Sequence, residues 1–566
     1  MRWSLLNPDQ NTVSSVKKAF RTSEVIARVL ANRNILNPNL ARPFFTPNLD
    51  MLHNPYLMQD MDKAVERVLT NINSGKPIMV FGDYDVDGTT GAASLYLAFQ
   101  KFGADVTYYI PDREKEGYGL SYHGIEVAKD IGIDLIITCD CGINAFVQVD
   151  FANEQNIDII ITDHHTTDTE LPKAHAILNP KREDCEYPFK GLCGGGVAFK
   201  LITAIGNELK IPLTDYEEII PLITLGTAAD VVPIKDENRV IVHHGLNILE
   251  NLEKPGLKTL LELAGLKGHI SVEQLVFSIA PRINAAGRIG DANRAVELLV
   301  TDDQDKARLL AKELDNENKR RQIIQQAVVD EALLKVNAEA DLKNENALVL
   351  ANAGWHPGVV GIVASKIKEE FNRPTIIIAL ENGSGKGSAR SVAGFDLYEA
   401  LTACKTHLDD YGGHPMAAGL TLSNKKLEDF KKAFINFANE RLTEENSQAT
   451  LTLDSEIALQ DITPRFMEFL DKLSPYGPGN IRPKFAIRNA EIAGAPKVIG
   501  KTGEHIRFKI RQGLKSCSAV GFGLSNKYEM LITGQPVDIA CVVETNEWQG
   551  NTSIQMNVRD IKRAVM

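Results

Sequence analysis

The sequence predicts an α/β protein with two α/β domains, joined by a long helix and followed by a small β-barrel. Three observations support this prediction. Short apolar runs rich in β-branched residues alternate with helical patterns through residues 51–300 and again through 341–445. Residues 301–340 are charged and contain neither Gly nor Pro, and residues 450–566 are short β-rich runs separated by Gly, Pro and Asn. A chain of 566 residues has room for about three to five domains.

The first α/β domain is expected over residues 51–300, after an arm over residues 1–50. The arm is polar and interrupted by Pro and Asn, which favours a segment lying on a domain. In the domain, the runs IMVF, IDLIIT and IDIIIT each stop at polar residues and are separated by helical patterns. This order is typical of a parallel sheet, in which ligands bind beyond the carboxyl ends of the strands.

A single long helix is expected over residues 301–340, because Leu310, Leu314, Ile324 and Val328 recur there at helical spacings. The second α/β domain follows over residues 341–445. There the runs NALVLAN and PTIIIAL alternate with the helical segment GVVGIVASKIKEEF.

The net charge of the chain is −12, but the charge is unevenly distributed. Residues 464–566 contain 15 Lys and Arg against 9 Asp and Glu, a net charge of +6. A basic antiparallel barrel over residues 450–566 favours an OB-type module for single-stranded nucleic acid, in which cations follow phosphates and aromatic rings stack on bases. The alternative is an ordinary barrel whose aromatic residues form its core. The candidate aromatic residues are Phe508, Phe522, Tyr528 and Trp548.

Composition excludes several classes of protein. With 44% hydrophobic and 24% charged residues, the chain is neither wholly disordered nor fibrous. The seven Cys residues include no C-x-x-C pair, which favours free thiols and a reducing cytoplasm. The first thirty residues lack the apolar stretch of a signal peptide, and a run of about 18 apolar residues occurs nowhere, so no membrane partner is expected.

Aspartates gather at the expected strand ends of the first domain. GDYDVDG places Asp83, Asp85 and Asp87 directly after IMVF, and Asp140 follows the next run. Converging carboxylates raise one another's pKa unless a cation neutralises them, so a divalent cation explains the pattern better than a solvated acidic loop does. An EF-hand is disfavoured because the distal Glu is missing.

Further candidate ligands are Asp163, His164 and His165 in D-H-H and Asp230 in LGTAADVVP. Adjacent His side chains on a loop diverge, so we expect one to bind an ion and the other to act on the substrate. Carboxylates with imidazoles suit Mn²⁺, Mg²⁺ or Zn²⁺, and the carboxylate-rich mixture favours Mn²⁺ or Mg²⁺. The ligands suffice for two ions, which together activate a bridging water and hold an in-line phosphoryl displacement.

The second domain contains candidate phosphate contacts. GSGKGSARS predicts a Gly-rich stretch whose backbone N–H groups approach a phosphate that Arg390 grips, and it is not a Walker A loop. YGGHPMAAG adds His414 behind two glycines. Turn formation is the alternative for both motifs.

Two other motifs leave two interpretations open. PRINAAGRIG supplies Arg282, Asn284 and Arg288 for phosphate recognition, or for helix capping and interdomain salt bridges. In GWHPG, Trp355 and His356 could both contact the substrate. For Trp355, packing beneath the loop is the alternative.

Taken in order, D-x-D-x-D-G, D-x-G, D-H-H and G-T-x-A-D resemble the DHH phosphoesterase superfamily, and GWHPGVVGIVASK, GSARS and YGGHPMAAG resemble its associated C-terminal domain. The pyrophosphatase branch has a His where Phe81 stands here. The resemblance implies a DHH domain and a DHH-associated domain. It assigns catalysis to His164, His165 and Asp140, and metal binding to Asp83, Asp85, Asp87, Asp140, His164, His165 and Asp230. It assigns substrate binding to Arg282, Asn284, Arg288, His356, Ser388, Arg390, Gly413 and His414. We expect Asp163 to orient an imidazole.

The resemblance implies a monomeric nuclease that uses two Mn²⁺ or Mg²⁺ ions to degrade single-stranded DNA from the 5′ end to mononucleotides. It further implies a role in DNA repair and recombination beside single-strand-binding protein and a RecQ-type helicase. Two alternatives remain open. One is a phosphodiesterase or pyrophosphatase of the same superfamily that acts on small substrates, and the other is a non-catalytic single-strand-binding relative.

Overall fold

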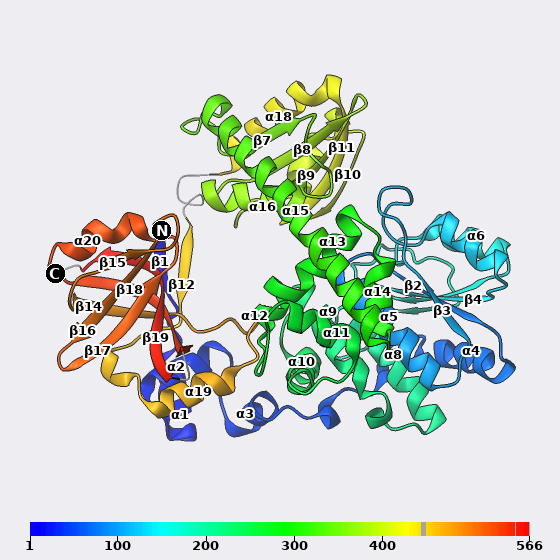
Figure 1. The fold of residues 1–566 in the computed structure, drawn as a ribbon, viewed down its shortest axis with the longest axis horizontal. Helices are drawn as coiled ribbons and strands as arrows, with labels where there is room; N and C mark the ends of the chain where they lie inside the picture. Colours follow the sequence, from blue (N-terminus) through cyan, green and yellow to red (C-terminus); the bar gives the residue numbers. More distant parts are fainter. Residues whose placement is uncertain (443–448, 549–550, 565–566) are drawn as a thin grey trace.

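The computed structural model describes residues 1–442, 449–548 and 551–564, which form three bodies at the corners of a triangle (Figure 1). The first α/β domain lies at the right of the view, the second α/β domain at the top and the barrel at the left. Within the described residues, no helix is both long and apolar enough to cross a membrane.

The first α/β domain is built on a parallel sheet in the order β3-β2-β4-β5-β6. In β2, β4 and β5, Gly82 pairs with Cys139 and Cys139 pairs with Thr162, so these three strands end at the same level. Their near-continuous β-branched sequences match their burial on both faces. The strands are β2 Ile78–Gly82, β3 Val106–Tyr109, β4 Leu135–Cys139, β5 Asp158–Thr162 and β6 Ala176–Leu178.

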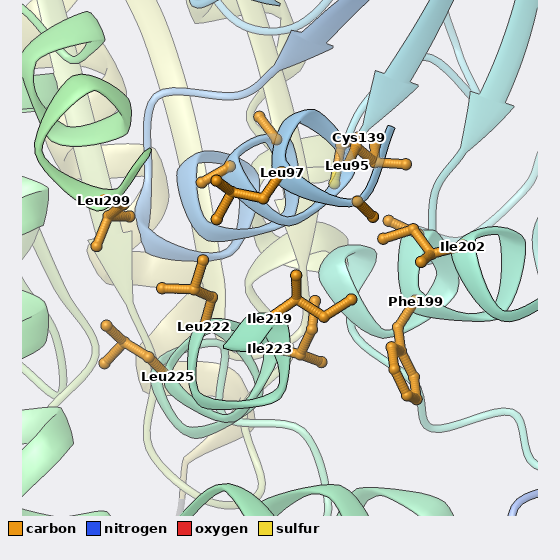
Figure 2. Close-up of a cluster of buried hydrophobic side chains, with 14 of the residues drawn as sticks. Leu95, Leu97, Cys139, Phe199, Ile202, Ile219, Leu222, Ile223, Leu225 and Leu299 are labelled. Carbon is orange, nitrogen blue, oxygen red and sulfur yellow. The ribbon is translucent and has the colours of Figure 1, made fainter. Parts of the chain in front are cut away.

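Helices cover both faces of this sheet, and the larger core lies under α5, α8 and α9. Leu95 and Leu97 of α5, Phe199 of α8 and Leu222 of α9 belong to this core together with Cys139 of β4 (Figure 2). Helix α9 is apolar on all sides because it is buried almost throughout. The helices are α4 Met61–Ser74, α5 Val86–Lys101, α6 Tyr122–Asp130, α7 Phe146–Glu154, α8 Gly194–Leu209, α9 Ile220–Ala229, α10 Asp236–Leu249, α11 Pro255–Leu263, α12 Val272–Gln274, α13 Ala280–Ile289 and α14 Asn293–Val300.

The predicted long helix is α15, Gln304–Glu339. Its 36 residues span about 54 Å at the rise of an α-helix. Leu310 and Leu314 pack into the core of the first domain, whereas Val328 and Val336 pack into the second. One helix therefore belongs to two cores and holds the two domains together (Figure 1).

The second domain has a mixed sheet in the order β10-β11-β9-β8-β7, in which β7 and β8 are parallel and the other pairs antiparallel. The expectation of a Gly-rich phosphate loop at GSGKGSARS is wrong. This segment is β9, paired on both sides, so its backbone groups serve the sheet and only its side chains can serve a ligand. The elements are β7 Leu348–Asn352, α16 Val360–Phe371, β8 Thr375–Glu381, β9 Ser384–Arg390, α17 Leu397–Ala403, β10 Asp410–His414, β11 Ala417–Ser423 and α18 Leu427–Arg441.

The C-terminal sheet closes on itself, because β14 pairs with both β18 and β16. An antiparallel barrel is expected from the sequence, but strands β17 and β19 pair in parallel. The elements are β13 Ser455–Glu456, α19 Pro464–Leu473, β14 Phe485–Ile492, β15 Lys497–Ile499, β16 His505–Gln512, β17 Lys515–Gly521, α20 Tyr528–Ile532, β18 Val537–Trp548 and β19 Asn551–Arg563.

The first residues of the chain pack on this barrel. Val16 and Leu30 share a core with Leu470 and Phe485, although hundreds of residues separate them in sequence. The N-terminus lies beside the barrel in Figure 1. The elements are α1 Gln10–Phe20, α2 Glu24–Asn32, α3 Pro38–Phe45 and β1 Arg2–Leu5, which pairs in parallel with β12 Thr450–Leu453.

Candidate active site

The site lies at the carboxyl ends of β2, β4 and β5. Since these strands end level, the residues that follow them, Asp83, Asp140 and Asp163, emerge side by side. Asp85 caps the N-terminus of α5 by accepting from the Gly88 N–H at 3.1 Å. Asp230 is the C-cap of α9, which packs against α5 and α8, and this packing carries Asp230 to the same edge.

The candidate ligands fall into three overlapping groups. In each, one ligand atom per residue lies within 4.8 Å of the others. Asp140 and His164 each belong to two of these groups. Such sharing is expected where two ions lie close together and have ligands in common. The groups are Asp83, Asp85 and Asp140; Asp140, His164 and His165; and Asp87, His164 and Asp230.

The buried donor atoms of these groups fit a bound cation. In the described part of the chain, Asp83 Oδ1, Asp140 Oδ1, His164 Nε2 and Asp230 Oδ2 are buried without a hydrogen-bond partner. His164 Nε2 lies 3.2 Å from Asp140 Oδ1 and 3.5 Å from Asp230 Oδ2, but without hydrogen-bonding geometry. Unpartnered buried polar atoms are costly, and cations at this convergence would satisfy them.

The pKa values of these side chains also indicate that the site binds cations. Burial and the neighbouring carboxylates raise the pKa of Asp140 and of Asp83 well above ordinary values. The same causes raise the pKa of Asp87 to about 6 and that of Asp230 to about 8. Burial lowers the pKa of His164 to about 3, which keeps its imidazole neutral, the form that binds metal. Carboxylates held this close require positive charge among them.

His165 has a different environment from His164, although their ring centroids are 4.6 Å apart. Its Nδ1 lies 2.7 Å from Asp163 Oδ1, and the backbone N–H groups of His164 and His165 donate to the same oxygen. Burial opposes ionisation of Asp163, but the bonds from His165 hold the pKa of this carboxyl below its usual value. Asp163 therefore orients the His165 imidazole and favours its protonated form.

Glycines that the sequence interpretation overlooked complete the site. The N–H groups of Gly194 and Gly195, at the start of α8, donate to the Asp87 carboxylate at 2.6 and 3.1 Å. A Cβ on Gly194 would stand 2.5 Å from the Asp140 Cβ, so the close approach requires glycine. The signal was present in the sequence as the glycine triplet of GLCGGGVA.

The three residues of PRINAAGR differ in their contacts. Arg282 donates from Nε to Asp315 of α15 at 2.9 Å, a salt bridge to the half of the long helix that packs on the first domain, so this bridge is not interdomain. Arg288 donates to the Gly358 carbonyl at 3.2 Å, and burial together with Arg113 and Arg321 lowers the pKa of Arg288 to about 10. Such a gathering of one buried and two partly buried cations favours an anionic ligand. Asn284 is half-buried on the same helix.

The second domain presents its candidates from β9 and β10. Ser388 and Arg390 share one face of β9, and Arg390 Nη1 donates to Ser388 Oγ at 2.9 Å. His414 is exposed at the end of β10 and lines a cavity together with His165. Gly413 has a φ of +140°, and a Cβ there would stand 2.5 Å from the Ala417 carbonyl. The structure thus brings residues of both domains to the same cavity.

The two candidate residues of the GWHPG loop, Trp355 and His356, have different environments. His356 accepts from the Gly358 N–H at 3.0 Å, and its Nε2 lies 4.0 Å from Glu114 of the first domain. Trp355 is buried in the core and donates to Glu331 of α15, so it packs beneath the loop.

The candidate aromatic residues of the barrel differ in their exposure. Phe508 is in the barrel core, so its ring cannot stack on a base. Tyr528 is half-buried against the same core, which restricts the ring face that a base could reach. Phe522 is 58% exposed and stands edge-on to His505, with ring centroids 5.2 Å apart. The side chain of Trp548 lies outside the described residues.

Three segments of the chain match known protein families. Residues 77–227 match the DHH family, N-terminal domain, residues 344–441 match the DHHA1 domain, and residues 453–560 match the RecJ OB domain. The first segment contains every member of the metal groups except Asp230, the second contains strand β9 with Ser388 and Arg390, and the third covers most of the barrel.

The similarity to individual proteins extends over the whole chain. The single-stranded-DNA-specific exonuclease RecJ of Bacillus subtilis is 38% identical over 99% of this chain and 70% of its own length. RecJ of Escherichia coli is 33% identical over 89% of this chain and 90% of its own. The crystal structure of RecJ with Mn²⁺ from Thermus thermophilus matches 100% of this chain and 80% of its own, with a TM-score of 0.85 and 29% identity, and a structure of the same protein with Mg²⁺ matches as well. The chain belongs to the RecJ family of single-stranded-DNA-specific exonucleases.

Proposed function

We propose that this protein is a single-stranded-DNA-specific exonuclease that uses two Mn²⁺ or Mg²⁺ ions. The observation that carries the proposal is the convergence of buried, unpartnered carboxylate and imidazole atoms shared among three ligand groups. Family membership and the Mn²⁺ and Mg²⁺ in solved RecJ structures support the reaction and the metals.

In this mechanism, Asp83, Asp85, Asp87, Asp140, His164 and Asp230 hold the ions. When bound, the ions lower the pKa of a coordinated water and offset the charge that develops on the phosphoryl oxygens. Neutral His164 is a ligand, and Asp163 holds His165 so that one ring nitrogen can face the substrate phosphate. The cationic form of His165, favoured by Asp163, would stabilise negative charge on that phosphate.

Positively charged groups opposite the ions hold the strand end. Arg288, Arg390 and Ser388 supply a guanidinium pair and a hydroxyl for phosphate oxygens. His356, Gly413 and His414 are proposed to contact the substrate from the second domain, with Asn284 from α13. Arg282 is proposed to act through its salt bridge with Asp315, which holds α13 against α15. The barrel would bind the strand beyond the site, consistent with its net charge of +6 over residues 464–566.

The finer parts of the proposal rest on the family resemblance. They are attack from the 5′ end, release of mononucleotides, a role in repair and recombination, and work beside single-strand-binding protein and a RecQ-type helicase. We also propose a monomer in the cytoplasm, which is consistent with seven cysteines that are all free thiols.

The decisive experiment compares 5′- and 3′-labelled single strands, duplex DNA, RNA and pyrophosphate as substrates with Mn²⁺ and with EDTA. We expect Mn²⁺-dependent loss of a 5′ label from single-stranded DNA as mononucleotide. Faster hydrolysis of pyrophosphate than of DNA would favour the small-substrate alternative. Binding of DNA without cleavage in Mn²⁺ or Mg²⁺ would favour the non-catalytic relative.

A further inference from the structure

A cavity of about 350 Å³ lies beside the metal groups and between the two α/β domains. On one side it reaches Asp163 and His165 of the first domain, and on the other Gly413 and His414 of the second. A cavity of this size lies in the range of small-ligand sites. If the substrate phosphate is held at the metal groups, the sugar and base attached to it would lie at the mouth of this cavity.

The cavity has a mixed lining, in which the Asp163 carboxylate and the imidazoles of His165 and His414 lie beside neutral polar and apolar groups. Leu120 and Ile143 also line the cavity, but each is only 2% exposed and adds little accessible surface. Among the described residues, neither Lys nor Arg lines the cavity, whereas the arginines proposed to hold phosphate lie elsewhere in the site. The lining therefore favours a nucleobase over a second phosphate.

Two amide side chains in the cavity are free to bind. Asn144 and Gln148, just before and within α7, line it, and in the described part of the chain their amides have no hydrogen-bond partner. Each amide offers donors and an acceptor, and rotation by half a turn exchanges them. Every base edge is a pattern of donors and acceptors, so such amides can pair with any of the four bases.

We propose that this cavity holds the base of the terminal nucleotide during its removal, with Asn144 and Gln148 bound to the base edge. The inference rests on the proposed function and deepens it. Adaptable amides explain how the enzyme can bind a terminal base firmly yet accept every sequence.

The test uses single-turnover cleavage of two strands that differ only in the terminal nucleotide at the cleaved end, which is either intact or abasic. The wild-type protein is expected to cleave the intact strand roughly 10-fold faster, the equivalent of one or two hydrogen bonds. Asn144→Ala with Gln148→Ala should lose this factor on the intact strand and little on the abasic one. Gln148→Met, which keeps the side-chain length, should show part of the same loss.

Glu154→Ala, at the exposed end of the same helix, is the matched control and should behave as wild type. Equal cleavage of the two strands by the wild type would overturn the inference while leaving the proposed function intact. An equal loss on both strands in the amide variants would also overturn it. Failure of the wild type to cleave either strand would overturn the proposed function and this inference with it.

Discussion

At the scale of single residues, Asp140 combines a shared ligand position with an unusual backbone conformation. It belongs to two of the three ligand groups, and its backbone φ of +63° lies in the left-handed region. Asp and Asn enter this region more readily than most residues, so the position combines a ligand with a backbone turn after β4. The Tyr118 hydroxyl donates to the Asp140 carbonyl at 2.9 Å and holds the turn.

Asp140→Asn should preserve this backbone while removing one ligand charge. We expect cleavage of single-stranded DNA in Mn²⁺ to fall by at least roughly 100-fold, with DNA binding largely retained. In metal-free protein the same change should raise the midpoint of thermal unfolding, because it relieves burial and repulsion of a carboxylate. Mn²⁺ should stabilise the wild type and the variant unequally, the wild type more.

The matched control is Asp150→Asn, an exposed position on α7. Single-turnover cleavage, DNA binding and thermal unfolding with and without Mn²⁺ measure the effects. Near-normal cleavage by Asp140→Asn would show that the proposed metal groups do not perform the reaction.

At the scale of elements, the loop that follows α9 connects the metal site to the C-terminal part of the chain. Next to Asp230, Val231 has a φ of +62°, which is rare for a β-branched residue. Three residues further on, the Ile234 N–H donates to the Pro478 carbonyl at 2.7 Å. The segment between α19 and β14 therefore holds the loop that presents the candidate ligand Asp230.

Arg239 of α10 strengthens the same junction. Its guanidinium donates to the carbonyls of Leu473, Ser474 and Pro475 and to that of Phe44, and it stands 3.8 Å from the Phe44 ring centroid. A single buried cation thus joins the first domain to the N-terminal arm and to the segment between α19 and β14.

Arg239→Met keeps the apolar stem and removes the donors. We expect a loss of stability of roughly 1–3 kcal/mol, because buried carbonyls lose their partner. Thermal unfolding measures the loss, and Arg308→Met is the control because Arg308 is an exposed residue paired with exposed Asp305. Equal midpoints for the two variants would contradict the proposed junction.

At the scale of the whole molecule, the barrel is not an appendage at one end. Its core includes α1 and α2, so a deletion that begins at Pro464 would uncover apolar residues of the N-terminal helices. Surface substitutions are therefore the better test of DNA binding. Lys497, Arg507 and Lys509 are exposed on the neighbouring strands β15 and β16, where Lys497 pairs with Arg507.

Replacing Lys497, Arg507 and Lys509 with Ala should weaken binding of single-stranded DNA and reduce its dependence on salt. If each contacts one phosphate, the slope of log K against log salt should fall in magnitude by about 2. Binding titrations over a range of salt measure the slope. Lys258→Ala with Lys267→Ala, on the first domain, is the control, and an unchanged slope in the barrel variant would place the DNA on another surface.

The sequence by itself determined the fold class and the long helix, and its motifs, with the family they resemble, named the candidate metal-binding residues. Strand and helix patterns are local, and the motifs lie directly after the strands whose ends bring Asp83, Asp140 and His164 together. The tertiary structure alone decided that Gly194 and Gly195 donate to Asp87, that GSGKGSARS is a paired strand and that Phe508 is core. It also decided that the first helices complete the barrel core and that Arg239 joins the first domain to the N-terminal arm and to the segment between α19 and β14. The physical reason is that hydrogen-bond partners and burial depend on segments far apart in sequence, which local patterns do not record.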